Sequence, residues 1–154
     1  DDVIPSNAVR IAVRFCRVDT VVVVLDADPD VVVFSEHHHV HAFPGILTAV
    51  LEEAARLGVT VRAPDDATRE RICRDGVETA DHFLASFYGS DNVSEDQLLE
   101  ILGTAPDGTS ELMCHPAHKD DRLETLSSYV GPRWAELATL TSPRVVAATT
   151  NFAT

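Results

Sequence analysis

The sequence predicts a single α/β domain, because short runs of β-branched residues alternate with longer segments of helical periodicity. Such alternation is typical of strand–helix–strand units around a largely parallel sheet. The chain has 154 residues, 45% of them hydrophobic, which suffices for one core but hardly for two. We find no internal repeat or linker that would divide residues 1–154.

The first two predicted strands are the apolar runs at residues 20–25 and 31–35. Both are short and bounded by turn-forming residues, as buried strands are. Residues 26–30 form an acidic connection between them, and Pro29 within it cannot continue either strand. The two runs are therefore expected to be successive strands joined by a turn.

The middle of the chain begins with a helix over residues 44–57. Its apolar residues recur three and four positions apart as far as Gly58, a residue type that favours helix C-caps. A short strand is predicted at residues 59–62, and a second helix at 68–74. Residues 81–88 are apolar and aromatic, and we interpret them as a strand.

The last third of the chain contains two predicted helices and one strand. Ser94 and Gln97 have the spacing of a capping box, which predicts a helix from there to about residue 103. Residues 111–115 form the next strand. A final helix is expected over residues 132–140, and the chain then continues into a segment without a predicted element.

The charge of the chain restricts its partners. A formal net charge of −13 and an isoelectric point near 4.7 oppose binding to phosphate backbones and anionic lipids, and no lysine or arginine run offsets this charge. Nucleic-acid and membrane partners are therefore not expected. Small neutral or cationic substrates are more compatible with this negative charge.

The cysteines indicate a reducing compartment. Cys16, Cys73 and Cys114 are odd in number, widely spaced and lack a C-x-x-C motif, which argues against disulfides and a structural zinc ribbon. The longest apolar run, residues 21–25, is far shorter than the ~20 residues of a membrane span. With no signal-type segment at the start, a cytoplasmic location is expected.

The densest group of potentially reactive side chains consists of four histidines after the second predicted strand: His37, His38, His39 and His41. Imidazole binds transition metals and has a pKa near neutrality. In an extended segment, His37, His39 and His41 would share one face. His115 ends another predicted strand, where catalytic groups of α/β proteins gather. The alternative is that one or two of these histidines only pack.

Residues 35–44, Ser-Glu-His-His-His-Val-His-Ala-Phe-Pro, closely resemble the D-S-H-[HQ]-H-V-H-x-x-P segment of the YdjC-like carbohydrate deacetylases, the family that includes chitooligosaccharide deacetylase. The resemblance continues in the same order through four further segments: residues 85–89, 111–117, 127–129 and 133–142. In order, these segments span about residues 29–146.

The resemblance implies an irregular (β/α) fold of the TIM-barrel type and a metal-dependent hydrolase that removes acetyl groups from N-acetylated amino sugars of oligosaccharides. It implies that His37 is a ligand of a divalent metal, Mg²⁺ or Zn²⁺, and that His115 is catalytic. In that mechanism an aspartate takes the proton of the attacking water and a histidine protonates the departing amine. His39 and His41 would orient ligands or substrate, or else pack. Tyr88 would contact the sugar.

Departures from the family pattern lie before the histidine segment. Asp1-Asp2 weakly matches the family's A-D-D-F-G strand; alternatively, and in our preferred interpretation, residues 5–15 are the helix that precedes the histidine strand. Ser35 replaces an acidic residue, with Glu36 next to it. A full barrel needs about 250 residues, so only its C-terminal portion is expected here.

The second functional hypothesis is a catalytically inactive remnant. Such a chain would bind metal or sugar, associate with a chain that carries the missing half, or form a homo-oligomer through exposed sheet edges. A third hypothesis, a cysteine hydrolase built on Cys114, is disfavoured, because a cysteine within an apolar strand is usually buried and inert.

Overall fold

The computed structural model describes residues 11–15, 21–25, 33–34 and 37–150, and it shows a mixed α/β fold. The predicted turn at 26–30, Asp1-Asp2 and Ser35-Glu36 lie outside these residues. The larger sheet has the order β1 (Ile11–Phe15), β2 (Val21–Leu25), β6 (Ser110–Cys114) and β5 (His82–Leu84). A smaller sheet pairs β3 (Val33–Phe34) with β4 (Thr60–Val61).

The sequence predicts a largely parallel sheet, and the larger sheet differs from this prediction. Only β5 and β6 are parallel within it, whereas β2 pairs antiparallel with both β1 and β6. The five residues between β1 and β2 explain the hairpin, because a parallel crossover needs a dozen or more residues. The crossovers are in the parallel pairs, where α1 separates β3 from β4, and α3 separates β5 from β6.

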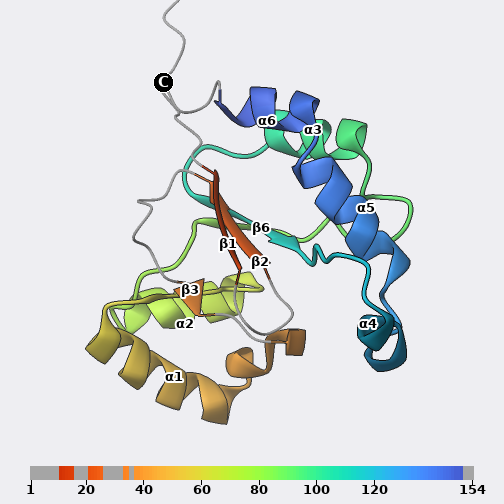
Figure 1. The fold of residues 1–154 in the computed structure, drawn as a ribbon. Helices are drawn as coiled ribbons and strands as arrows, with labels where there is room; N and C mark the ends of the chain where they lie inside the picture. The colour runs from red at the N-terminus through yellow and green to blue at the C-terminus, as the bar shows by residue number, and fades with distance from the viewer. Residues whose placement is uncertain (1–10, 16–20, 26–32, 35–36, 151–154) are drawn as a thin grey trace, which may run out of the picture.

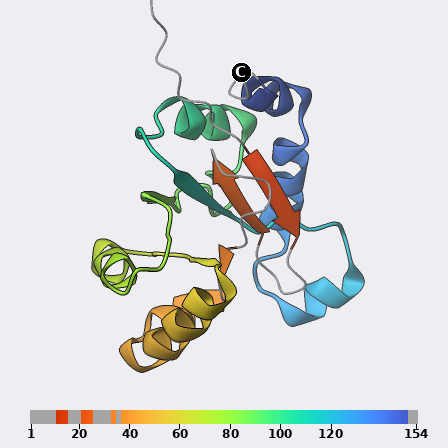
Figure 2. The ribbon, with the colours of Figure 1, turned by 90° about the vertical axis from the view of Figure 1, so that its left-hand side faces the viewer.

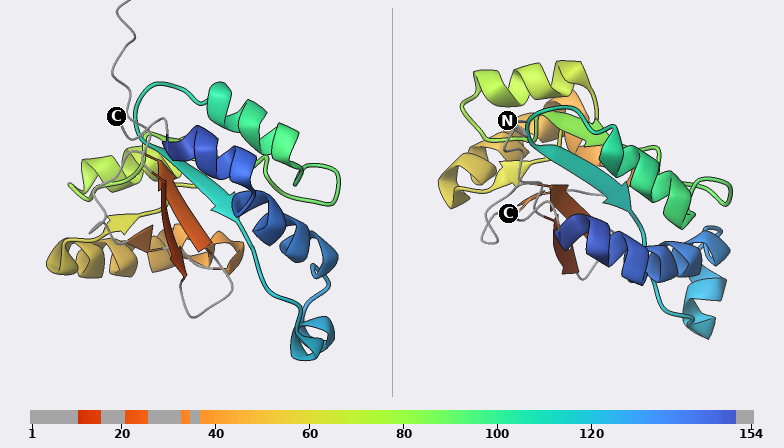
Figure 3. Two further views of the ribbon diagram at one scale, coloured as in Figure 1. Left: turned by 45° about the horizontal axis from the view of Figure 1, so that its top comes forward. Right: turned by 90° about the horizontal axis from the view of Figure 1, so that it is seen from above.

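Helices lie on opposite sides of the strands. In Figure 1, α3, α5 and α6 lie at the upper right and α1 and α2 at the lower left, and Figures 2 and 3 show the same separation from other directions. The helices are η1 (His37–Ala42, 3-10), α1 (Pro44–Leu57), α2 (Asp66–Arg74), α3 (Glu95–Gly103), α4 (Asp121–Leu126), α5 (Gly131–Leu140) and α6 (Pro143–Thr150). None of the helices in the described ranges has the length and apolar character that a membrane crossing requires.

Two helix ends follow the predicted capping chemistry. Helix α1 ends at Leu57 as expected, and Gly58 adopts the left-handed conformation with φ 65° and donates its N–H to the carbonyl of Ala54. Helix α3 starts after Ser94, whose hydroxyl accepts the N–H of Gln97 at 3.3 Å. Local sequence signals therefore set these boundaries.

The larger sheet is packed on both faces. In β6, Leu112 and Cys114 lie on the face opposite to Glu111, since strand side chains alternate. Leu112 and Cys114 belong to a buried cluster with residues from α3, α6 and the loops before them: Phe87, Val93, Leu98, Leu102 and Val145. A second buried cluster joins α1, β4 and α2: Leu47, Leu51, Ala54, Val61, Ala63, Ile72 and Val77.

Two predicted elements need correction, and two helices were not expected. The helix expected at residues 5–15 is wrong for its described part, because Ile11–Phe15 pairs with β2 as a strand. The strand expected at 81–88 is limited to His82–Leu84, since Phe87 leaves the sheet to fill the first cluster. Helices α4 and α6 were not predicted. Helix α6 begins at Pro143, a favoured first helical residue, and buries Val145.

Replacing Gly58 by alanine tests the C-cap of α1. No atom lies within 4 Å of a Cβ added there, so the expected loss of about 1 kcal/mol arises only from the left-handed backbone. Gly45 in the same helix has similar free space and no positive φ. Gly45→Ala should therefore raise stability by about 0.5 kcal/mol in urea unfolding. Equal effects of the two substitutions would contradict this account.

Candidate active site

The parallel pairing of β5 with β6 brings two candidate residues together. Leu84 is paired with Leu112 in parallel, so the segments that follow the two strands leave the sheet at the same end. Tyr88 lies in the first segment and His115 in the second, and their ring centroids are 5.4 Å apart. It is the carboxyl end of both strands, where α/β enzymes have their catalytic groups.

Two tyrosine rings, those of Tyr88 and Tyr129, pack against the His115 imidazole. Tyr88 stacks on Tyr129 with centroids 4.5 Å apart and an interplanar angle of 9°. His115 contacts Tyr129 edge-on at 5.7 Å. Tyr88 is 45% exposed, whereas Tyr129 and His115 are half-buried. The site therefore presents a partly open aromatic surface beside an imidazole.

Helix α5 holds the main chain of His115 at both of its polar groups. The His115 N–H donates to Oε2 of Glu136, and Nη1 of Arg133 donates to the His115 carbonyl at 3.3 Å. Oε1 of Glu136 accepts the Tyr129 hydroxyl at 2.6 Å, and Nε of Arg133 donates to the Tyr129 carbonyl at 2.8 Å. Arg133 and Glu136 are both buried. The imidazole therefore projects from a fixed main chain.

Burial controls the titration of this region. It raises the pKa of the Glu136 carboxyl, although the hydrogen bonds from Tyr129 and His115 oppose the change. Burial and the bond to Glu136 also raise the pKa of Tyr129, which keeps its phenol protonated. Burial raises the pKa of the Cys114 thiol far above its ordinary value, so Cys114 is not an activated nucleophile.

The histidine segment is a 3-10 helix and not the extended segment that we had predicted. Its side chains therefore do not alternate as in a strand, and the expected alternation of His37, His39 and His41 on one face of an extended segment does not apply. His39 has a φ of 53°, a left-handed conformation that is uncommon for residues other than glycine and breaks the regular alternation. The side chain of His37 lies outside what the structure describes.

His39 and His41 belong to a group of side chains on the face of the larger sheet that carries Glu111, opposite to Leu112 and Cys114. His41 is fully buried, and its Nε2 donates to the carbonyl of Arg62 at 2.9 Å. Phe83 contacts the His39 ring edge-on at 5.4 Å, and the Arg62 guanidinium lies 5.1 Å from the Phe83 centroid. Arg62 forms a buried ion pair with Glu111, with Nε 2.6 Å from Oε1.

The described residues do not by themselves make a metal centre. Among the side chains that the structure describes, which do not include those of His37 and His38, no three histidine, cysteine, aspartate or glutamate residues are grouped to hold a metal ion. The ring centroids of His39 and His41 are 6.1 Å apart in an edge-on arrangement. With His41 already bonded to a carbonyl, this pair does not supply the set.

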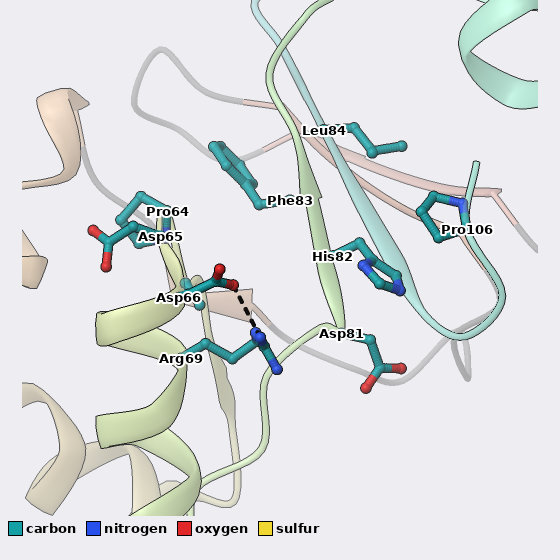
Figure 4. Close-up of a pocket in the computed structure, with 10 residues that line it drawn as sticks. Pro64, Asp65, Asp66, Arg69, Asp81, His82, Phe83, Leu84 and Pro106 are labelled. Carbon is teal, nitrogen blue, oxygen red and sulfur yellow. Dashed lines mark hydrogen bonds and ion pairs between the residues drawn. The ribbon is translucent and has the colours of Figure 1, made fainter. Parts of the chain in front are cut away.

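A cavity of about 410 Å³ lies along β5, between this strand and the start of α2, and neither Tyr88 nor His115 lines it. Figure 4 shows Asp66 and Arg69 directed toward each other on α2, 2.9 Å apart, with Asp81 and His82 at the start of β5. Asp81 accepts the Thr109 N–H at 2.8 Å. These polar groups are bonded within the protein, so we do not place the reaction in this cavity.

Comparison with known proteins identifies the family. Residues 34–151 match the model of the family described as YdjC-like protein. The chain belongs to the YdjC-like family. The match begins at Phe34 in β3 and contains the histidine segment, Tyr88, His115 and α5. The family resemblance found in the sequence is thereby confirmed, while β1 and β2 lie before the matched range.

Relatives of this YdjC-like chain are named as deacetylases. The carbohydrate deacetylases of Thermoanaerobacter pseudethanolicus and Geobacillus stearothermophilus are 39% and 38% identical to it over 71% and 72% of this chain, and in each case over 43% of the relative. The chitooligosaccharide deacetylase of Yersinia pestis (strain Pestoides F) is 38% identical over 70% of this chain and 43% of its own length. The chain thus spans less than half the length of these relatives.

A solved structure supports the fold. A crystal structure of an Enterococcus faecalis V583 protein, named as a candidate for cellobiose-phosphate cleavage, superimposes with a TM-score of 0.66 and 28% identity. The alignment covers 77% of this YdjC-like chain and 48% of the other. The described part of the chain therefore has an α/β arrangement that also occurs within a larger protein.

Sequence reasoning found His115 and Tyr88 but assigned no role to Arg133 or Glu136. A signal was present in α5, since Arg133, Glu136 and Thr139 recur three residues apart on its buried face. Charged residues are rarely buried on a helix face unless they are paired or hydrogen-bonded. Their spacing therefore points to an internal polar contact, although it does not say which loop they hold.

The buried ion pair can be tested by a double-mutant cycle. Glu111→Leu leaves the Arg62 guanidinium buried without its partner and should cost about 3–5 kcal/mol of unfolding free energy. The double variant Arg62→Met/Glu111→Leu should be much less destabilised in urea unfolding. As a matched control, Glu53→Leu removes the exposed pair with Arg56 and should change stability little. Additive losses at Arg62 and Glu111 would contradict the coupling.

Proposed function

We propose that this chain forms part of a carbohydrate deacetylase that removes acetyl groups from N-acetylated amino sugars of oligosaccharides. The observation that carries the proposal is the contact between His115 and the Tyr88–Tyr129 pair at the carboxyl ends of β5 and β6. The names of the relatives, carbohydrate deacetylase and chitooligosaccharide deacetylase, give the substrate class. The site supplies an imidazole and a sugar-sized aromatic surface together.

His115 is the proposed catalytic acid. In amide hydrolysis, water adds to the acetamide carbonyl, the carbon–nitrogen bond breaks, and the departing nitrogen must gain a proton to leave as an amine. Imidazole supplies a proton near neutral pH because its pKa lies in that range. Arg133 and Glu136 fix the main chain of His115, which holds the base of its side chain in place beside Tyr88 and Tyr129.

Tyr88 is the proposed sugar contact. One face of its ring stacks on Tyr129, and its exposed fraction of 45% leaves area for a ligand. The apolar face of a pyranose ring packs well on such an aromatic surface, which desolvates both partners. A sugar held on Tyr88 would lie next to the His115 imidazole, whose centroid is 5.4 Å away.

We extend the proposal to a divalent metal, Mg²⁺ or Zn²⁺, with His37 as one ligand. The support is the match of the histidine segment to the YdjC-like family. His39 and His41 would then contribute indirectly: His41 through its bond to the Arg62 carbonyl, and His39 through its packing on Phe83. The described residues do not by themselves complete a ligand set.

We also propose that the chain supplies part of an irregular TIM-barrel-like fold. Two parallel β–α–β units, β3–α1–β4 and β5–α3–β6, follow each other along the chain. Strands β4 and β5 are edges of their sheets, and the cavity is lined by β5 and by the residues after β4. A continuous barrel would pair these two edges.

A cytoplasmic setting completes the proposal. Of the described cysteines, Cys73 is exposed and Cys114 buried, and neither forms a disulfide within the described part of the chain. Free thiols are typical of reducing compartments, where disulfides are rare.

The proposed activity predicts acetate release from N,N'-diacetylchitobiose in the presence of Mg²⁺ or Zn²⁺, and no release after chelation. His115→Ala should lower kcat by roughly 100-fold or more, because the departing amine loses its proton donor. His118→Ala is the matched control, since His118 is an exposed histidine three residues away. Sugar binding without acetate release at any metal concentration would instead support the inactive remnant.

Metal binding by His37 can be measured without turnover. Isothermal titration with Zn²⁺ or Mg²⁺ should show weaker binding for His37→Ala than for the unmodified chain, because one ligand is lost. His118→Ala should bind as the unmodified chain does. Equal affinity of all three proteins would remove His37 from the proposed ligand set.

A further inference from the structure

Helix α5 buries an acidic side chain beside the candidate site. Glu136 is 0% exposed, and burial disfavours its charged form. An apolar residue of similar size would pack there at lower cost, so the carboxylate must offset its desolvation through its bonds. Both of its oxygens accept hydrogen bonds, one from a side chain and one from the main chain.

These bonds reach two segments that the sheet does not hold. The pairing of β5 with β6 ends at Leu84, and the pairing of β2 with β6 ends at Cys114. Beyond these residues, the His115 N–H donates to Glu136. The Tyr129 hydroxyl donates to Glu136 and accepts the Gly89 N–H at 2.9 Å, next to Tyr88. One carboxylate thus links both segments to α5.

We propose that Glu136, acting with Tyr129, is a positioning residue that holds the sugar-facing ring of Tyr88 and the imidazole of His115 at a fixed separation. The inference rests on the proposed deacetylase function and extends it to residues that do not touch the substrate. Tyr129 has two separate contacts in this arrangement. Its ring stacks on Tyr88, and its hydroxyl fixes the residue after Tyr88.

The two residues have distinguishable effects. Tyr129→Phe keeps the stacked ring and removes the hydroxyl, so the Tyr88 segment loses its link while the His115 N–H keeps its acceptor. Glu136→Gln keeps the shape but has one acceptor oxygen in place of two, and it replaces a charged acceptor by a weaker neutral one. The first variant should therefore affect substrate binding, and the second the position of the imidazole.

The test measures amide hydrogen exchange by NMR on the full chain. In Tyr129→Phe, the Gly89 amide should exchange about tenfold faster, as expected for one lost hydrogen bond, with the His115 amide unchanged. In Glu136→Gln, the His115 amide should exchange several-fold faster, and the His115 imidazole resonances should shift. Tyr88→Phe is the matched control: it removes the other phenol hydroxyl and should leave both amides protected.

Substrate measurements separate positioning from general destabilisation. Tyr129→Phe should raise the Kd and KM for N,N'-diacetylchitobiose with little change in kcat, and Glu136→Gln should lower kcat with less change in Kd. The proposal is overturned if both variants exchange like the unmodified chain at Gly89 and His115. It is also overturned if exchange accelerates equally at remote amides such as Ile72, or if Kd and kcat change in proportion.

The exchange and Kd measurements do not require turnover. If the unmodified chain releases no acetate but the amides and the sugar Kd respond as described, the positioning role stands and the hydrolase function fails. If acetate is released but the amides do not respond, the hydrolase function stands and the role of Glu136 fails.

Discussion

The buried ion pair between Arg62 and Glu111 connects the two sheets of the structure. Arg62 follows β4 of the smaller sheet, and Glu111 lies within β6 of the larger one, with a separation of 2.6 Å between Nε and Oε1. Around this pair, His41 bonds the Arg62 carbonyl and Phe83 packs on the guanidinium. The side of the molecule formed by α1 and α2 is therefore tied to the sheet by a polar contact that is costly to break.

The opposite face of the sheet is apolar and supports the candidate site. Leu112 and Cys114 alternate with Glu111, so the strand that carries the ion pair on one face anchors the cluster under α3 and α6 on the other. Directly after this strand comes His115, which α5 holds through Arg133 and Glu136. The position of the imidazole thus depends on the register of a single strand, β6, and on one helix.

The sequence predicted those features that depend on near neighbours. Helix α1, its cap at Gly58 and the start of α3 follow from periodicity and capping chemistry, and all are confirmed. The antiparallel hairpin was missed because Ile11–Phe15 was expected to be part of a helix. The 3-10 helix at His37–Ala42 was missed because the run of histidines after an apolar segment was interpreted as extended chain. In the candidate site, Tyr88 and His115 could be proposed from a motif, but Glu136 gained a role only when α5 was placed beside the loops, because that role depends on contact with a distant segment.

The side chains of the candidate active site all come from one continuous stretch of the chain, from Tyr88 to Glu136. The two strands that precede its loops, β5 and β6, begin no earlier than His82. The histidine segment and the Arg62 side of the structure precede this stretch in the chain. The side chains of the candidate active site are therefore close together in the sequence as well as in space. Substitutions before His82 can therefore reach Tyr88 and His115 through contacts with β5 and β6, such as the buried ion pair between Arg62 and Glu111.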